Sequence, residues 1–159
     1  MQKNIKKKTL EKIRKNILEN IITAAYSAGA SSAHLGGALS MVDIINIIFS
    51  RYINLNPENI NNIDRDYFIL SKGHACLAYY SMLAERKFFE KKELKKFEKN
   101  ESLLLGHPVL NKKFGIDFST GSLGMGIGIA VGLAIGLKKK ESNNHIYVVM
   151  GDGECNEGS

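Results

Sequence analysis

The chain has 159 residues, of which 44% are hydrophobic and 24% charged, so it can bury the core of one domain and is not intrinsically disordered. Its net charge of +6 comes from residues 1–15, where seven Lys or Arg stand against a single Glu. The remainder is neutral, which excludes the extended basic surface of a nucleic-acid-binding protein. The longest apolar stretch, 123–137, is interrupted by glycines and shorter than the ~20 residues of a membrane span, which excludes an integral membrane protein.

The compartment follows from the start of the chain and from the cysteines. Residues 1–9 are predicted to form a basic, solvated N-terminal arm. No continuous apolar segment of a secretory signal follows it, and the two cysteines form no CxxC pair. We therefore expect a cytoplasmic protein.

The first half of the chain predicts two helices and one strand. Apolar residues at three- and four-residue spacing over 10–25 predict a helix with one apolar face, ended by Gly29 and the small residues that follow. A second helix begins near Ser40, and the Asn-rich segment 54–66 is predicted to be a loop. The apolar run 67–70 is rich in strand-forming residues, so we expect a strand there.

The second half predicts three helices and a second strand. A helix is expected from 75 to about 87, and the segment 85–99, with alternating charges, is expected to be an exposed amphipathic helix. After a polar loop, a helix over 122–139 carries a stripe of glycines that would admit another backbone: Gly124, Gly128, Gly132 and Gly136. The run 145–150 is β-branched and almost continuously apolar, which is typical of a strand buried on both faces of a parallel sheet.

Two strands separated by helices predict an α/β fold, a parallel sheet with helices on both faces in three layers. A parallel sheet of two strands is not a stable unit by itself. We therefore expect residues 1–159 to be part of a domain whose flanking strands lie further downstream.

The turn Gly151-Asp152-Gly153 follows the second strand, where ligands of α/β sheets bind. A carboxylate there can coordinate Mg²⁺ that bridges phosphates, and glycines let a diphosphate approach the backbone. The alternative is a turn in which Asp152 caps the next helix. Similarly, residues 119–122 open a helix and either bind an anion at its N-terminus or only cap it.

Three of the four histidines, His34, His74 and His107, stand beside glycine at a predicted turn or helix start. Side chains at such positions can converge on a cleft, and imidazoles are the usual proton-transfer groups near neutral pH. Any one of them taken alone can equally have a structural role. As a set beside a diphosphate site, they favour carbanion chemistry on hydroxylated substrates.

Five motifs stand together in one order: Ala-His-Leu-Gly-Gly-Ala-Leu-Ser (33–40), Asp-Arg-Asp-Tyr-Phe-Ile-Leu-Ser-Lys-Gly-His-Ala (64–75), Gly-His-Pro (106–108), Ser-Thr-Gly-Ser-Leu-Gly-Met-Gly (119–126) and Gly-Asp-Gly-Glu-Cys-Asn-Glu-Gly (151–158). In this order and spacing they resemble the N-terminal thiamine-diphosphate-binding domain of transketolases, including split forms whose halves are separate chains. The resemblance covers residues 10–159. It implies the thiamine-diphosphate-binding fold and a transferase of carbohydrate metabolism that moves a two-carbon ketol unit from a ketose phosphate to an aldose phosphate.

The resemblance also implies cofactors, site residues and partners. Asp152 would be a Mg²⁺ ligand, and the cofactor thiamine diphosphate would be bound by His74, Gly121, Ser122, Leu123, Asp152 and Gly153. His34 and His107 would be catalytic residues that face the substrate. The implied partners are sugar phosphates and a C-terminal pyrimidine-binding domain or subunit, in a homodimer or heterotetramer.

The chain departs from the family pattern in three places. Many members have Gly-His-Pro-Gly-Gly where this chain has 33–37. The second metal ligand, an Asn about thirty residues beyond Gly-Asp-Gly, and the glutamate of the second domain that activates the cofactor lie beyond Ser159. We therefore expect a truncated chain that is inactive alone; the alternatives are an enzyme of the deoxyxylulose-phosphate-synthase type and a non-catalytic truncated product.

Overall fold

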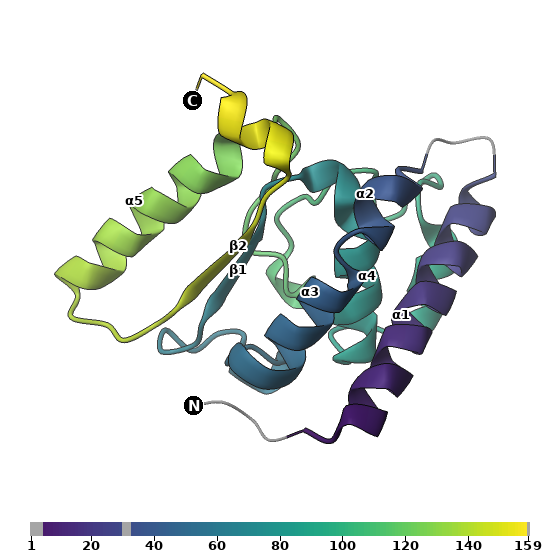
Figure 1. The fold of residues 1–159 in the computed structure, drawn as a ribbon, viewed down its shortest axis with the longest axis horizontal. Helices are drawn as coiled ribbons and strands as arrows, with labels where there is room; N and C mark the ends of the chain where they lie inside the picture. The colour runs from purple at the N-terminus through teal and green to yellow at the C-terminus, as the bar shows by residue number, and fades with distance from the viewer. Residues whose placement is uncertain (1–4, 30–32, 159) are drawn as a thin grey trace.

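The structure is a computed structural model and describes residues 5–29 and 33–158. Residues 1–4 of the predicted basic arm lie outside the described residues. Two parallel strands, β1 (Tyr67–Leu70) and β2 (Ile146–Val149), lie between α5 (Met125–Lys139) on one side and a layer of helices on the other (Figure 1). The predicted three-layer α/β arrangement is therefore confirmed.

Among the described residues, the helical layer opposite α5 contains four α-helices: α1 (Lys7–Ala28), α2 (Leu35–Leu39), α3 (Val42–Ile47) and α4 (Cys76–Glu85). α4 is its centre, because nine of its ten residues are buried and its sequence is apolar on every side. α1 packs against α4 and α3 with a buried stripe of Ile17, Ile21 and Ala24. The predicted helices are confirmed here, and α1 ends at Ala28 with Gly29 as its C-cap, whose φ of 65° favours glycine.

The four residues of β1 pair in register with the four residues of β2, which confirms both predicted strands. Phe68 of β1 joins the sheet to the helical layer, with its ring centroid 5.0 Å from that of Phe49 and 4.8 Å from that of Tyr79. On the opposite face, α5 contacts both strands. Within the described residues each strand has one neighbour, so one edge of each strand is unpaired.

The prediction of an amphipathic helix over 85–99 is wrong. The chain forms a single 3-10 segment, Lys91–Lys96, between Lys87 and Glu98, which have positive φ angles of 63° and 56°. The apolar side chains of the segment pack into the hydrophobic core instead of lining one face of a helix. Leu94 and Phe97 are both buried at a spacing of three, which matches the three residues per turn of a 3-10 helix.

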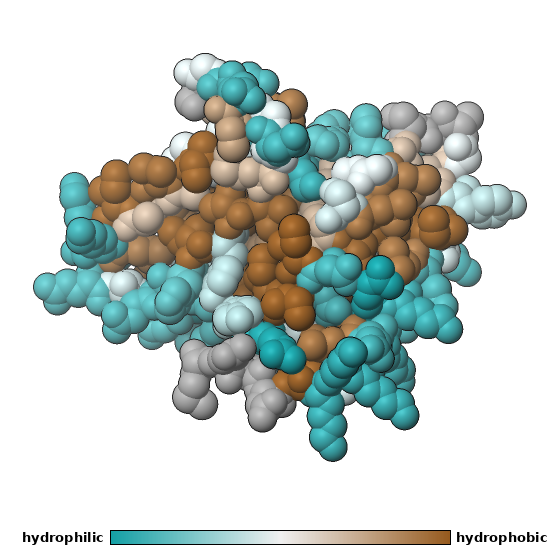
Figure 2. Space-filling view, viewed as in Figure 1, coloured by the Kyte–Doolittle hydropathy of each residue, from teal (hydrophilic) through white to brown (hydrophobic). Residues whose placement is uncertain are grey.

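Within the described residues, no other backbone approaches the predicted glycine stripe of α5. Gly128, Gly132 and Gly136 face open space, and the apolar side chains beside them leave a hydrophobic surface over α5 (Figure 2). The close approach occurs at Gly126, where an added Cβ would lie 2.4 Å from the Ser71 side chain. Among the described helices, none is long and apolar enough to cross a membrane.

Candidate active site

The carboxyl ends of β1 and β2 lie side by side because the strands are parallel, and this edge is where α/β sheets bind ligands. The Ser71 amide donates a 2.9 Å hydrogen bond to the carbonyl of Val149, so the segment after β1 stays in register with β2. Both strands lead into a cleft of about 390 Å³. Its walls come from four parts of the chain: Gly36, Gly37, Ser40, Lys72, His74, Leu123, Gly151, Asp152, Gly153 and Glu154.

The structure brings together some, but not all, of the predicted cofactor-binding residues. Those that line the cleft are His74, Leu123, Asp152 and Gly153. Gly121 lies instead against His107, because a Cβ on Gly121 would be 3.3 Å from that ring. Ser122 is exposed and lines neither this cleft nor the one beside His107.

The histidines His34, His74 and His107 converge, although they come from distant parts of the chain. The ring centroid of His34 lies 5.6 Å from that of His74 and 6.4 Å from that of His107. His34 and His107 line a second cleft of about 360 Å³. Burial lowers the pKa of His74, and the neighbouring His34 and Lys72 lower it further, which favours the neutral imidazole.

Glycines allow the segments around the histidines to pack this closely. A Cβ on Gly37, in α2, would lie 3.0 Å from the His74 ring. A Cβ on Gly73 would lie 2.6 Å from the carbonyl oxygen of Thr120, a contact too short to exist. The small residues before and within α2 predict no helix, yet α2 forms and sets the position of His34 beside His74.

Glu154 is a site residue that the sequence analysis missed. It is 4% exposed, and its carboxylate accepts hydrogen bonds from Ser71 Oγ at 2.7 Å, from the Gly124 amide at 2.9 Å and from the Gly151 amide at 2.7 Å. Burial raises its pKa, but these hydrogen bonds outweigh burial and keep the pKa below its usual value. Glu154 therefore joins the ends of β1 and β2 to the start of α5.

The role of Lys72 was also missed, because its place in the motif 64–75 does not by itself show that the side chain is enclosed rather than solvated. The residue is 8% exposed, and its Nζ donates to the Gly37 carbonyl at 3.2 Å and to Ser40 Oγ at 3.0 Å. Burial lowers its pKa, and the nearby carboxylates of Glu154 and Asp152 oppose that shift. The cleft thus has a buried ammonium group in its wall.

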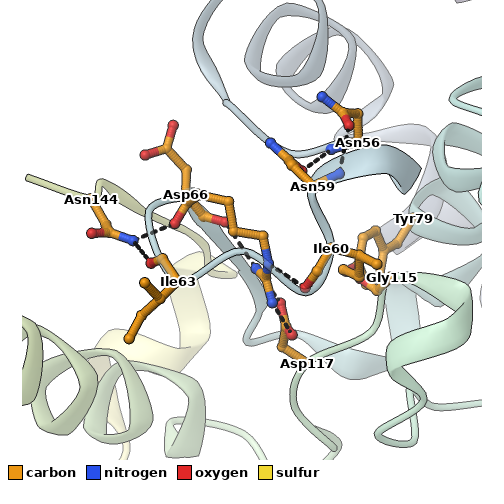
Figure 3. Close-up of polar contacts among 10 residues, drawn as sticks. Asn56, Asn59, Ile60, Ile63, Asp66, Tyr79, Gly115, Asp117 and Asn144 are labelled. Carbon is orange, nitrogen blue, oxygen red and sulfur yellow. Dashed lines mark hydrogen bonds and ion pairs between the residues drawn. The ribbon is translucent and has the colours of Figure 1, made fainter.

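A buried ion pair at the opposite end of β1 anchors the loop that leads to Gly121 (Figure 3). Arg65 donates to both oxygens of Asp117, at 2.9 and 2.6 Å, and the two side chains are 4% and 5% exposed. Arg65 Nε also donates to the Ile60 carbonyl at 2.8 Å. Asn144, just before β2, donates to the carbonyl groups of Ile63 and Arg65 on the loop before β1, so this cluster fixes the approach to both strands.

The residues of the cleft fit a magnesium-bound diphosphate. Asp152 presents an exposed carboxylate, and a Cβ on Gly153 would meet nothing within 4 Å, so the backbone of this turn is accessible. Thr120 Oγ1, beside Gly121, is buried without a hydrogen-bond partner among the described residues. The described residues contain no group of three or more His, Cys, Asp or Glu side chains arranged to hold a metal ion. A single carboxylate still suits Mg²⁺, which commonly binds through one or two carboxylates together with phosphate oxygens and water.

Comparison with known proteins supports the same assignment. Residues 6–159 match the family described as transketolase, thiamine diphosphate binding domain. The chain is 40% identical over 156 residues to an apulose-4-phosphate transketolase subunit from Actinobacillus succinogenes, covering 98% of this chain and 56% of that protein. It is 34% identical over 125 residues to 6-deoxy-6-sulfo-D-fructose transketolase subunit SqwG from Clostridium sp., covering 79% of this chain and 46% of that protein.

Solved structures agree with the sequence comparison. A transketolase from Pichia stipitis in complex with sedoheptulose 7-phosphate superimposes with a TM-score of 0.83 at 31% identity, covering 94% of this chain and 23% of that one. The chain thus spans about half the length of the subunits it matches and about a quarter of the solved transketolase. The predicted fold class is confirmed, and the chain belongs to the transketolase family through its N-terminal thiamine-diphosphate-binding domain.

Proposed function

We propose that this chain supplies the diphosphate-binding half of a magnesium- and thiamine-diphosphate-dependent transketolase. That enzyme transfers a two-carbon ketol unit from a ketose phosphate to an aldose phosphate. The observation that carries the proposal is the convergence at the carboxyl ends of β1 and β2. Asp152 and His74 line one cleft there, and His34 and His107 have ring centroids within 6.4 Å of each other beside it.

Asp152 would hold Mg²⁺, and the accessible backbone at Gly153 together with His74 would bind the diphosphate. Leu123, which is 41% exposed at the cleft, would contact the cofactor, with Gly121 and Ser122 on the same turn. When bound, thiamine diphosphate supplies a nucleophilic carbanion and an electron sink. The roles of all these residues rest on their matching family positions, and those of His74, Leu123, Asp152 and Gly153 also on their placement around one cleft.

His34 and His107 would act on the substrate. They line the second cleft together, where imidazole nitrogens can hold hydroxyl groups of a sugar phosphate and move a proton to or from its carbonyl oxygen. The neighbouring His74 is shifted toward its neutral form, which lowers the positive charge that His34 would experience.

The active enzyme needs a second domain or chain that binds the pyrimidine ring of the cofactor. Two of the similar proteins are described as transketolase subunits, which supports a separate partner chain. We propose a homodimer or a heterotetramer of the assembled enzyme. Cys76 and Cys155 are both free thiols, which fits the reducing cytoplasm as its compartment.

The test combines this chain with a chain that carries a transketolase pyrimidine-binding domain, a ketose phosphate donor and an aldose phosphate acceptor. We expect ketol transfer that requires thiamine diphosphate, Mg²⁺ and both chains, while the isolated chain binds the cofactor weakly in calorimetry. Asp152→Asn should abolish transfer, whereas Asp64→Asn, which removes an exposed carboxylate outside the cleft, should not.

Two results would contradict this proposal. Transfer from pyruvate but not from a ketose phosphate would identify the deoxyxylulose-phosphate-synthase type of enzyme. Failure of the assembled chains to bind the cofactor, with each chain shown to be folded by circular dichroism, would indicate a non-catalytic product.

A further inference from the structure

We propose that Lys72 is a phosphate-binding residue of the cleft, whose ammonium group contacts the diphosphate and offsets charge that Mg²⁺ leaves uncompensated. This inference rests on the proposed function and gives a role to a motif residue that the resemblance left without one. It starts from the position of Lys72. The residue lies directly after β1 and lines the same cleft as His74, Asp152 and Gly153.

The ammonium group is held in place before any ligand binds. Its two hydrogen bonds go to Gly37 and Ser40, which lie 35 and 32 residues earlier in the chain. An ammonium group has three N–H donors, and the described residues accept from two of them. The group is therefore positioned by α2 and the turn after it, with donor capacity left for a ligand.

The charge of Lys72 is not neutralised by an ion pair within the described part of the chain. Its two acceptors are an uncharged carbonyl and a hydroxyl group. Glu154 is nearby, but its carboxylate already accepts three hydrogen bonds from Ser71, Gly124 and Gly151. A buried ammonium without a bonded counter-ion is costly, so an anionic ligand in the cleft would relieve that cost.

The ligand chemistry that fits is a diphosphate rather than a carboxylate. Lysine binds phosphate as a compact point charge. The carboxylate of Asp152, which lines the same cleft, would repel a bare anion, and Mg²⁺ bound together with the diphosphate would offset that repulsion. Because the Asp152 carboxylate would offset part of the magnesium charge, the ammonium group of Lys72 would supply the further positive charge that a diphosphate needs.

The experiment measures binding of inorganic pyrophosphate with Mg²⁺ to the 159-residue chain by NMR titration of backbone amides at millimolar ligand. The variants are Lys72→Gln, which keeps a hydrogen-bond donor without the charge, and Lys72→Arg, which keeps the charge. Lys140→Met is the matched control, because it removes one exposed positive charge outside the cleft. Circular dichroism and thermal unfolding establish that each variant is folded.

We expect Lys72→Gln to weaken pyrophosphate binding about tenfold, because a neutral hydrogen bond replaces a charge-assisted one. Lys72→Arg and Lys140→Met should stay within about threefold of the unmodified chain. Equal binding by Lys72→Gln and the unmodified chain, or absence of any pyrophosphate response in the unmodified chain, would overturn the role of Lys72. An equal loss of pyrophosphate affinity in Lys72→Arg and Lys72→Gln would also overturn it, since the shape of the side chain rather than its charge would then determine the affinity.

The proposed function has a separate readout, which is ketol transfer by the assembled chains. Transfer that persists unchanged in Lys72→Gln together with unchanged pyrophosphate affinity would reject Lys72 while leaving the transketolase proposal standing. Pyrophosphate binding that depends on Lys72, without any ketol transfer, would instead reject the transketolase proposal alone.

Discussion

Ser71 at the end of β1 donates a 2.7 Å hydrogen bond to Glu154, which lies 83 residues later in the turn after β2. The same serine packs against Gly126 in α5, because a Cβ at Gly126 would overlap its side chain. One small polar residue therefore joins the two strand ends and the helix that covers them. The turn Gly151-Asp152-Gly153 is held by this junction rather than by local sequence alone.

Glu154→Ala should destabilise the chain, because it leaves a buried hydroxyl and two buried amides without their shared acceptor. We expect a loss of about 2–4 kcal/mol in the free energy of unfolding, from urea titration followed by circular dichroism. Glu157→Ala, which removes an exposed carboxylate from the same turn, should change it by about 0.5 kcal/mol or less. Equal effects of the two substitutions would show that the hydrogen bonds of Glu154 are not important for stability.

Two glycines of α5 should respond oppositely to alanine. Gly126→Ala places a methyl group where Ser71 Cβ and Cα stand, so we expect a destabilisation of about 1–3 kcal/mol. Gly132→Ala places the same methyl group in open space within a helix, so we expect a gain of about 0.5–1 kcal/mol. Thermal unfolding of the two variants side by side checks both signs, and a loss at Gly132 equal to that at Gly126 would contradict the packing of α5.

Substitutions of Arg65 and Asp117 should have strongly non-additive effects on the free energy of unfolding. Removing either partner leaves the other buried charge without compensation, so Arg65→Met or Asp117→Leu should each cost about 3–5 kcal/mol. The double variant should recover a large part of that loss, because two apolar side chains then replace two charges. A double-mutant cycle by chemical denaturation measures the coupling, and additive losses in the double variant would refute it.

The two cysteines should differ in reactivity. Cys76 is 1% exposed, its Sγ donates to the carbonyl of Gly106, and burial raises its pKa to about 12, whereas Cys155 is exposed. A thiol reagent at pH 8 should therefore modify one thiol rapidly in the folded chain and two in denaturant, and Cys155→Ser should remove the rapid reaction. Rapid modification of two thiols in the folded chain would show that Cys76 is accessible.

The raised pKa of Cys76 also predicts how the free energy of unfolding changes with pH. The folded pKa of Cys76 lies above the reference value of 9.0 for the thiol, so the unfolded chain loses this proton first as pH rises. The stability associated with Cys76 is then complete below pH 9.0 and declines between pH 9.0 and about 12. Cys76→Ala should flatten this part of the stability profile measured by urea titration.

The strands and the principal helices could be predicted because their patterns are local. An apolar run such as 67–70 and the periodic apolar face of α1 indicate which residues are buried, and the structure confirms both elements. The segment 85–99 was predicted wrongly because its apolar residues pack against the core, while its alternating charges resemble those of an exposed helix. The close contact of α5 at its glycine Gly126 was not predicted for a related reason, since only tertiary packing decides which glycine of α5 meets another segment.

The sequence by itself determined the family motifs, the two strands and the order in which the candidate site residues follow them, since each depends on short-range patterns. Only the tertiary structure decided that His34, His74 and His107 meet, that Glu154 is buried as a shared acceptor and that Lys72 is enclosed. The reason is that burial and convergence depend on contacts between segments far apart in the chain. A lysine or glutamate in a turn has the same local sequence whether it is solvated or enclosed.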